Sequence, residues 1–444
     1  MHRSPRNAGS DRPALSSSTG KRRYFGTDGV RGVVGTEITV ELVERLARAA
    51  TLWSGRGRVF VGRDTRASGV ELEEAFGRGV AAAGGSAVLA GVLPTPAVAL
   101  LALDLGVVIS ASHNPPEYNG VKFFDRDGSK LTDASEEEIE AVLDDPGFDT
   151  LPHAAGTVDR VEVAPDSYLE HIVERFGADL TGMRIAVDCA NGAYSEIAPE
   201  AFEEMGAEVT AIGVEPDGEN INVGCGATDL SLLSRVVREK RLDLGVAFDG
   251  DGDRVLAVDG NGEVVDGDQI LAVLALHMGV ELVAVTVMTN LGFHRLMEER
   301  GIRVVTTPVG DRYVLEALRR EGGGLGGEQS GHIIILRDHV TGDGLAAALL
   351  LCHAIRGTTL ADAVAVMPRY AQVKENVRVS RRDVPAEALA EAERLNRSLN
   401  GGGRVLVRAS GTEPVIRVLG EAETPEEAER LCGTIAALVR RELG

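Results

Sequence analysis

Lysine and aromatic side chains are scarce in this sequence of 444 residues, of which only 4% are Phe, Trp or Tyr. The chain has 46 basic and 68 acidic side chains, giving a net charge of −22. Nonspecific nucleic-acid binding depends on basic patches, so this balance argues against a nucleic-acid partner. An acidic surface instead suits a salt-rich cytoplasm, where dissolved ions screen self-repulsion. The few lysines are Lys21, Lys122, Lys130, Lys240 and Lys374.

Paired cysteines, membrane spans and export signals are also missing. The cysteines are far apart and show no CxxC spacing, so neither a zinc site nor a disulfide framework is indicated, and reduced thiols in a cytosol are expected. They are Cys189, Cys225, Cys352 and Cys432. The longest apolar region, 270–288, is broken by His277 and Glu281, so it predicts a helix followed by a strand and no membrane partner. No apolar region follows Arg22-Arg23, so no export signal is indicated and a cytoplasmic location is expected.

One pattern of strand, polar strand end, helix and second strand occurs three times, in residues 58–96, 184–218 and 282–312. Apolar strands that alternate with helices predict βαβ units and mainly parallel sheets. The sequence "LDLGVVISASHNP" (103–115) also matches "LDLGVAFDGDGDR" (242–254), and "GGGLGGEQSGHII" is a looser third copy. We therefore expect three related α/β domains, each with a polar loop at an equivalent strand end.

The C-terminal part of the chain has a different pattern. Strands are expected at 372–380, 404–409 and 414–420, with helices at 385–398 and 425–442. Neighbouring strands joined by a short loop imply an antiparallel hairpin. The predicted fold class is α/β, with three related mixed or parallel domains and a smaller C-terminal α+β domain. The expected parts are a disordered tail at 1–20 and domains at 21–155, 160–260, 261–368 and 370–444.

The loop "FDGDGDRV" (248–255) carries the strongest chemical signal. Asp249, Asp251 and Asp253 alternate with glycines directly after an apolar strand, and three such close carboxylates repel one another unless a cation binds. Oxygen ligands favour Mg²⁺ or Ca²⁺. An EF-hand is excluded because Arg254 and Gly260 occupy the positions of its required Gly and Glu. The alternative is a solvated acidic turn.

Three further loops are candidates for binding anions or sugars. In "VRASGTEPVIRV" (407–418), Arg408 and Arg417 bracket hydroxyl and N–H groups that could cup a phosphate, unless the arginines merely face solvent. Glu328 and Ser330 in "GGEQSGHI" fit sugar hydroxyls, with a plain polar loop as the alternative. Arg31 in "RYFGTDGVRG" could add positive charge. The residues between the two arginines are Ser410, Gly411 and Thr412.

The stretch "VVISASHNPPEYNGVKFF" (107–124) contains the candidate nucleophile. Ser112 aligns with Asp251 when the two LDLGV segments are superposed, so a hydroxyl and the acidic loop occupy equivalent places. A metal ion near a serine fits phosphoryl transfer. A serine hydrolase does not fit, since no G-x-S-x-G elbow is present. His113 either orients the loop or takes part in chemistry, and Lys122 is either a proton donor or acceptor or a phosphate cation.

Together these four motifs, in this order, resemble the α-D-phosphohexomutase superfamily from about Tyr24 to the C-terminus. The resemblance implies four domains around a central cleft. It implies that Ser112 is phosphorylated and that Mg²⁺ is bound by Asp249, Asp251, Asp253 and the phosphate on Ser112. It further implies sugar contacts from Glu328 and Ser330, proton transfer or charge stabilisation by Lys122 and Arg254, and a grip on the non-reacting phosphate by Arg408, Ser410, Gly411, Thr412 and Arg417.

The resemblance also implies the reaction, in which phospho-Ser112 donates to a sugar monophosphate and a bisphosphate intermediate turns around. "YFGTDGVRG" and "VGDRYVLEALR" resemble the branch that interconverts glucosamine 6-phosphate and glucosamine 1-phosphate. Ala409 replaces a proline usual in that branch, so glucose and mannose phosphates are the alternative substrates. A Mg²⁺-dependent phosphatase and a silent sugar-phosphate sensor are the competing classes. The expected partner is a small sugar phosphate, and both monomer and homodimer stay open.

Overall fold

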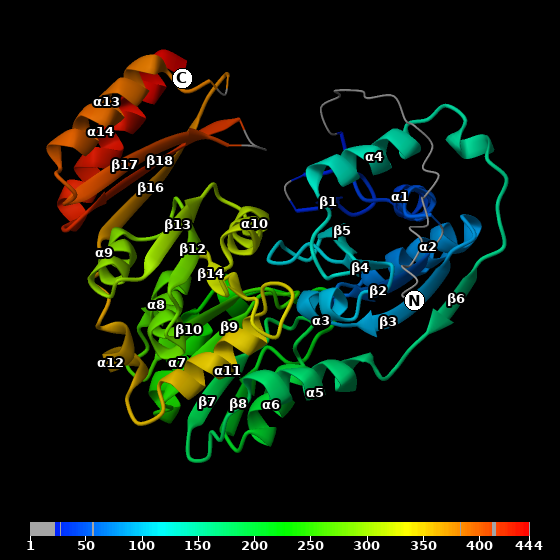
Figure 1. Ribbon diagram of the computed structural model, residues 1–444, viewed down its shortest axis with the longest axis horizontal. Coiled ribbons are helices and arrows are strands. Elements are labelled where there is room, and N and C mark those ends of the chain that lie inside the picture. Colours follow the sequence, from blue (N-terminus) through cyan, green and yellow to red (C-terminus); the bar gives the residue numbers. More distant parts are fainter. Residues whose placement is uncertain (1–22, 27, 56, 382, 411–413, 444) are drawn as a thin grey trace, which may run out of the picture.

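The computed structural model describes residues 23–443, apart from residues 27, 56, 382 and 411–413. The predicted tail at 1–20 lies outside this range. Each domain contains one sheet, and the first and fourth domains lie on opposite sides of Figure 1, with the second and third between and below them. No helix in these described ranges is long and apolar enough to cross a membrane.

The first domain has a six-stranded mixed sheet in the order β1-β5-β4-β2-β3-β6. Its strands are β1 Val30–Val33, β2 Arg58–Arg63, β3 Ser86–Val92, β4 Leu105–Ile109, β5 Tyr118–Asp125 and β6 Thr157–Arg160. Its helices are α1 Val40–Trp53, α2 Gly69–Ala82, α3 Thr95–Leu100, α4 Asp133–Leu143 and the short 3-10 turn η1 Phe148–Thr150. The fully buried strand β4 leads directly into the serine loop.

The second sheet has the order β11-β10-β9-β7-β8 and the third the order β13-β12-β14-β15. The second domain contains α5 Ala164–Phe176, β7 Arg184–Asp188, α6 Ile197–Glu204, β8 Glu208–Ile212, η2 Gly226–Thr228, α7 Ser231–Lys240, β9 Leu244–Phe248, β10 Val255–Asp259 and β11 Val264–Val265. The third contains α8 Gly267–Met278, β12 Leu282–Thr286, α9 Leu291–Glu299, β13 Arg303–Thr307, α10 Asp311–Glu321, β14 Leu325–Gly327, β15 Ile333–Ile335, α11 Gly344–Ala354 and α12 Leu360–Val364. Here α8 and β12 confirm the helix and strand predicted for the longest apolar region.

A common strand order relates these three domains. Each sheet contains one antiparallel strand beside three parallel ones, as β5-β4-β2-β3, β10-β9-β7-β8 and β15-β14-β12-β13. The two LDLGV segments lead into β4 and β9, the same strand of the repeat. The prediction of three related α/β domains is therefore confirmed. Since β4, β9 and β14 are equivalent, the serine, acidic and Glu328 loops that follow them are equivalent too.

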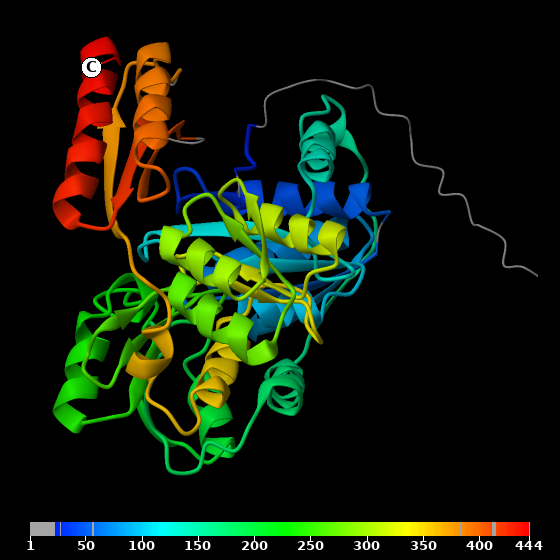
Figure 2. The same ribbon diagram turned by 60° about the vertical axis from the view of Figure 1, so that its left-hand side comes forward.

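The fourth domain is a three-stranded antiparallel sheet with two helices, as predicted. The order is β16-β18-β17, with β16 Ala371–Arg378, β17 Gly403–Ala409, β18 Val415–Ala422, α13 Ala386–Ser398 and α14 Pro425–Leu443. Both helices lie on one face of the sheet (Figure 2), where Val377, Val405 and Ile416 are buried with them. Alternation along a strand places Lys374, Arg408 and Arg417 on the other face.

Candidate active site

Ser112 follows β4 in a left-handed backbone conformation with φ 53°. It is 1% exposed, and its N–H donates to Ser110 Oγ at 2.8 Å. Its hydroxyl donates to Asp249 Oδ2 of the second domain at 2.6 Å, and His113 Nδ1 lies 3.2 Å from Ser112 Oγ. Non-glycine residues rarely adopt this conformation unless their surroundings enforce it. The loop therefore holds the serine oxygen against the acidic loop.

Arg66 holds the serine loop in this conformation. It was not predicted from the sequence. Its side chain is fully buried, pairs with Asp64 at 2.9 Å, and donates to four carbonyls of the serine loop. The carbonyls belong to Ser112, Asn114, Pro115 and Tyr118. Asp64 in turn accepts from Ser110 Oγ at 2.6 Å. The polar residues of "GRDTRASG" at the end of β2 could have indicated it. Because β2 runs parallel to β4, the carboxyl ends of the two strands meet at one edge of the sheet.

The predicted acidic trio forms one buried cluster. Asp249, Asp251 and Asp253 each offer an oxygen within 4.8 Å of the others. Gly252 makes the loop possible, because its φ is +78° and a Cβ there would meet the Tyr194 ring at 2.3 Å. The Tyr194 hydroxyl donates to buried Asp343 at 2.9 Å. The trio is thus built on a rigid apolar and hydrogen-bonded base.

The cluster fits a divalent cation. Oδ1 of Asp251 and Oδ1 of Asp253 are buried with no hydrogen-bond donor among the described residues. Burial, followed by the charges of Asp253 and Asp251, raises the pKa of Asp249 well above its usual range. A bound cation relieves both the unmet acceptors and the repulsion, and carboxylate oxygens suit hard divalent ions.

Six buried or half-buried side chains, here called the charge ring, join the first three domains, with three acids alternating with two lysines and a histidine. Around the ring they are Asp253, Lys122, Asp28, Lys130, Asp311 and His332. Lys122 Nζ lies 3.4 Å from both Asp253 and Asp28, and also donates to Asp251 Oδ2 at 2.7 Å. His332 lies 3.7 Å from Asp253 and closes the ring.

The charge ring keeps its lysines and acids ionised. Burial opposes the charge of Lys122, but Asp251, Asp28 and Asp253 outweigh burial and raise the pKa of this lysine. Burial likewise opposes the charge of Asp28, whose pKa is nevertheless held well below its usual range by Arg31, Lys122 and Lys130. Lys122 is therefore a cation at neutral pH. Lys130 and His332 were not predicted, although His332 ends the quoted "GGEQSGH" motif.

His113 and Arg254 flank the serine and the acids. Burial, then Arg254 and Arg31, lower the pKa of His113 to about 4, so its imidazole is neutral at pH 7. Arg254 Nε is 3.7 Å from Asp253, and its backbone N–H donates to Asp249 at 3.1 Å. Arg31 pairs with Asp28. The structure thus brings together His113, Arg254 and Arg31 around the predicted serine and trio.

The Glu328 loop lies beside this cluster. Burial raises the pKa of Glu328, whose carboxylate accepts from Gly310 N at 3.0 Å. Ser330 is exposed. Asp311 at the start of α10 pairs with Lys130 at 2.6 Å, so its charge is already matched. Of the two carboxylates, Glu328 is the better candidate for an ammonium group.

The two predicted arginines of the fourth domain are direct cross-strand neighbours. Arg408 on β17 pairs with Arg417 on β18, and Arg417 pairs with Asn376 on β16. These side chains line a pocket of about 290 Å³ that also contains Lys374 and Met288. Burial, then the like charge of Arg417, lower the pKa of Arg408. Ser410 is buried nearby, whereas Gly411 and Thr412 lie outside the described residues.

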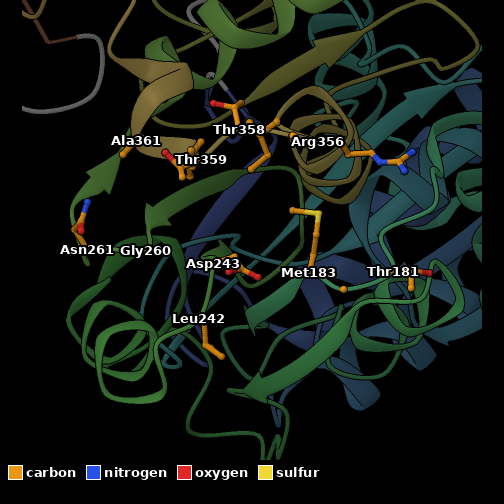
Figure 3. A pocket seen from close by; sticks show the side chains of 14 residues that line it. Thr181, Met183, Leu242, Asp243, Gly260, Asn261, Arg356, Thr358, Thr359 and Ala361 are labelled. Atoms are coloured by element: carbon orange, nitrogen blue, oxygen red, sulfur yellow. The ribbon is translucent and has the colours of Figure 1, made fainter.

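A second pocket, of about 510 Å³, lies at the opposite edge of the second sheet (Figure 3). It is bordered by Met183 and Asp243, which precede β7 and β9, and by the segment 355–361. The predicted motifs follow the carboxyl ends of their strands, so none of their residues lines this pocket. Ligands of open α/β sheets bind at the carboxyl ends of strands, which favours the Ser112 side.

Four family matches span the described fold. Residues 22–149, 166–262 and 266–370 match phosphoglucomutase/phosphomannomutase alpha/beta/alpha domains I, II and III, and residues 375–438 match the C-terminal domain of that family. Together they cover well over half of the chain.

Individual relatives agree with these matches. Phosphoglucosamine mutase of Streptomyces coelicolor is 48% identical over 453 residues, which is 95% of this chain and 100% of the relative. Phosphoglucosamine mutase of Bacillus subtilis is 43% identical, covering 95% and 99%. A crystal structure of a phosphoglucomutase/phosphomannomutase family protein from Burkholderia thailandensis superposes with a TM-score of 0.81 at 24% identity, covering 94% of this chain and 97% of that one.

Proposed function

Because this chain belongs to the phosphoglucomutase/phosphomannomutase family, we propose that it is a phosphohexomutase acting on glucosamine 6-phosphate and glucosamine 1-phosphate. The observation that carries the proposal is the 2.6 Å contact between Ser112 Oγ and Asp249, at a buried junction of two domains. Relatives named phosphoglucosamine mutase at 43–48% identity support the amino sugar. Glucose and mannose phosphates are the alternative substrates.

In the proposed reaction, the phosphoryl group of phospho-Ser112 passes to the free hydroxyl of the sugar monophosphate. The serine oxygen keeps the electron pair of the broken P–O bond and takes up the proton that the sugar hydroxyl loses, so that Ser112 ends the step as a free hydroxyl. The bisphosphate then turns around and returns its other phosphoryl group to Ser112. Lys122, held as a cation by its acids, stabilises charge on the moving group, and neutral His113 beside Ser112 Oγ orients the loop.

Asp249, Asp251 and Asp253 would hold the metal ion, which we propose to be Mg²⁺, together with the phosphate on Ser112. Bound there, the ion would neutralise charge on the phosphoryl group. Arg254, which lies beside Asp253 in the same loop, would contact the same phosphate. Glu328 and Ser330 would contact sugar hydroxyls, and Arg31 would add positive charge near Asp28.

The fourth-domain pocket would hold the phosphate that is not reacting. Arg417→Ala is expected to raise KM for the sugar monophosphate by about tenfold or more, with a smaller change in kcat, because it removes a charge-assisted contact. Steady-state kinetics at low salt measures this. The control is Arg430→Ala, an exposed arginine of α14 that pairs with Glu427. Unchanged kinetics in Arg417→Ala would place Arg417 outside the phosphate site.

Substrate choice is the experiment that tests the proposed function. The values of kcat/KM for glucosamine, glucose and mannose 6-phosphates should be compared at two salt concentrations. We expect a preference for glucosamine 6-phosphate that shrinks as salt rises, since partly exposed ion pairs are screened. Glu328→Gln, which keeps the side-chain size, should reduce that preference. A clear preference for glucose or mannose at both salt concentrations would overturn the amino-sugar assignment.

A phosphatase would release inorganic phosphate without isomerised sugar. The fourth-domain pocket argues against this, because simple hydrolysis of a phosphoserine does not require the far end of the sugar to be held. Measuring inorganic phosphate alongside isomerised product in the same assay separates the two reactions.

A further inference from the structure

Lys374 shares the fourth-domain pocket with the two arginines. On the open face of the sheet, side chains two residues apart point the same way, which puts Lys374 and Asn376 of β16 beside Arg417 of β18 and Arg408 of β17. Among the described side chains that line the pocket there are three cations and no carboxylate. Only an anion complements such a lining.

The Lys374 ammonium is held by a neutral partner. Its Nζ donates to Gln329 Oε1 at 2.5 Å, and within the described part of the chain no carboxylate lies within ion-pair distance of it. Gln329 stands between Glu328 and Ser330, and its Nε2 donates to Gln372 Oε1 at 3.0 Å. The amide thus fixes the amine without neutralising it. Burial lowers the pKa of this amine, and the charges of Asp268, Asp266 and Glu421 oppose that effect from beyond ion-pair distance.

We propose that Lys374 is a further substrate-binding residue, whose ammonium contacts the non-reacting phosphate together with Arg408 and Arg417. Gln329 positions that ammonium from the loop that would touch the sugar. The inference rests on the proposed function for the sugar part of the ligand, but the phosphate contact itself does not. The hydrogen bond between Lys374 and Gln329 would therefore couple phosphate binding at the pocket to the position of the loop that carries Glu328 and Ser330.

The test uses Lys374→Met, which keeps the length of the side chain without its charge, and Lys374→Arg, which keeps the charge. The first should raise KM for glucosamine 6-phosphate about tenfold or more, with kcat changed less. It should raise the dissociation constant of inorganic phosphate, measured by calorimetry, by a similar factor. Lys374→Arg should recover most of both values. Lys240→Ala, an exposed lysine of α7, is the control expected to change neither.

Gln329→Ala separates direct from indirect action. If Gln329 only positions Lys374, the double variant with Lys374→Met should bind phosphate no more weakly than Lys374→Met alone. Unchanged KM and unchanged phosphate affinity in Lys374→Met, with Arg417→Ala weakening both, would overturn the proposal. Absence of isomerase activity in the wild type would instead contradict the proposed function, and the phosphate titration would still decide the role of Lys374.

Discussion

Replacing Ser112 with alanine is expected to reduce isomerisation of the sugar phosphate below detection and to remove one phosphoryl group from the protein. The hydroxyl donates to Asp249 and is the group placed to carry phosphate beside the acidic trio. Alanine tolerates the left-handed backbone about as well as serine, so the loop should persist. Intact-mass measurement reports the phosphoryl group, and steady-state kinetics report turnover.

Ser110→Ala is the matched control for this variant. Ser110 lies two residues away in the same peptide and bonds the Ser112 N–H, but it does not contact the trio. This variant should keep the phosphoryl group on Ser112 and lose only part of the rate. Full activity of Ser112→Ala, or a phosphoryl group that disappears only in Ser110→Ala, would remove Ser112 from the mechanism.

Asp251→Asn is expected to lower kcat by about a hundredfold or more, since metal stabilisation of a phosphoryl transition state is worth several kcal/mol. The asparagine keeps the size of the side chain but removes one of the three carboxylate charges proposed to hold the metal ion. It also removes one of the charges that compensate buried Lys122. Titration of Mg²⁺ into metal-free protein should give an affinity at least about tenfold weaker than that of the wild type.

Asp259→Asn provides the comparison, because Asp259 is also nearly buried but accepts turn N–H groups at the far end of β10. It should change neither Mg²⁺ affinity nor kcat. If wild-type protein stripped of metal by EDTA keeps its full rate, the trio is structural and the proposed metal role is wrong.

Local motifs explain why much of the site could be predicted. The LDLGV repeat indicates equivalent strands, and this equivalence predicts that Ser112 and the acidic trio occupy equivalent loops of related domains. The alternation of Asp and Gly indicated a cation site on its own. In both cases the informative residues are neighbours in the chain, so their spacing carries the geometry.

Contacts between distant segments could not be predicted in this way. Arg66 lies 46 residues from the Ser112 carbonyl that it holds, and Lys130 lies 102 residues from Asp28. A lone arginine or lysine gives no sign of its partner until the strands are ordered. The left-handed backbone conformation of Ser112 could not be predicted either, because glycine is the residue that usually indicates such a conformation in a sequence.

The charge ring has a consequence for how the protein is made. Lys122 leaves the ribosome well before Asp251, Asp253, Asp311 and His332, so a half-synthesised chain holds a lysine whose carboxylate partners are mostly still missing. An ammonium is costly to bury without them, so its pocket should stay hydrated until the second domain emerges. The nascent first domain should thus be protease-sensitive around 107–124. Completion of the charge ring would then wait for the third domain, which supplies Asp311 and His332.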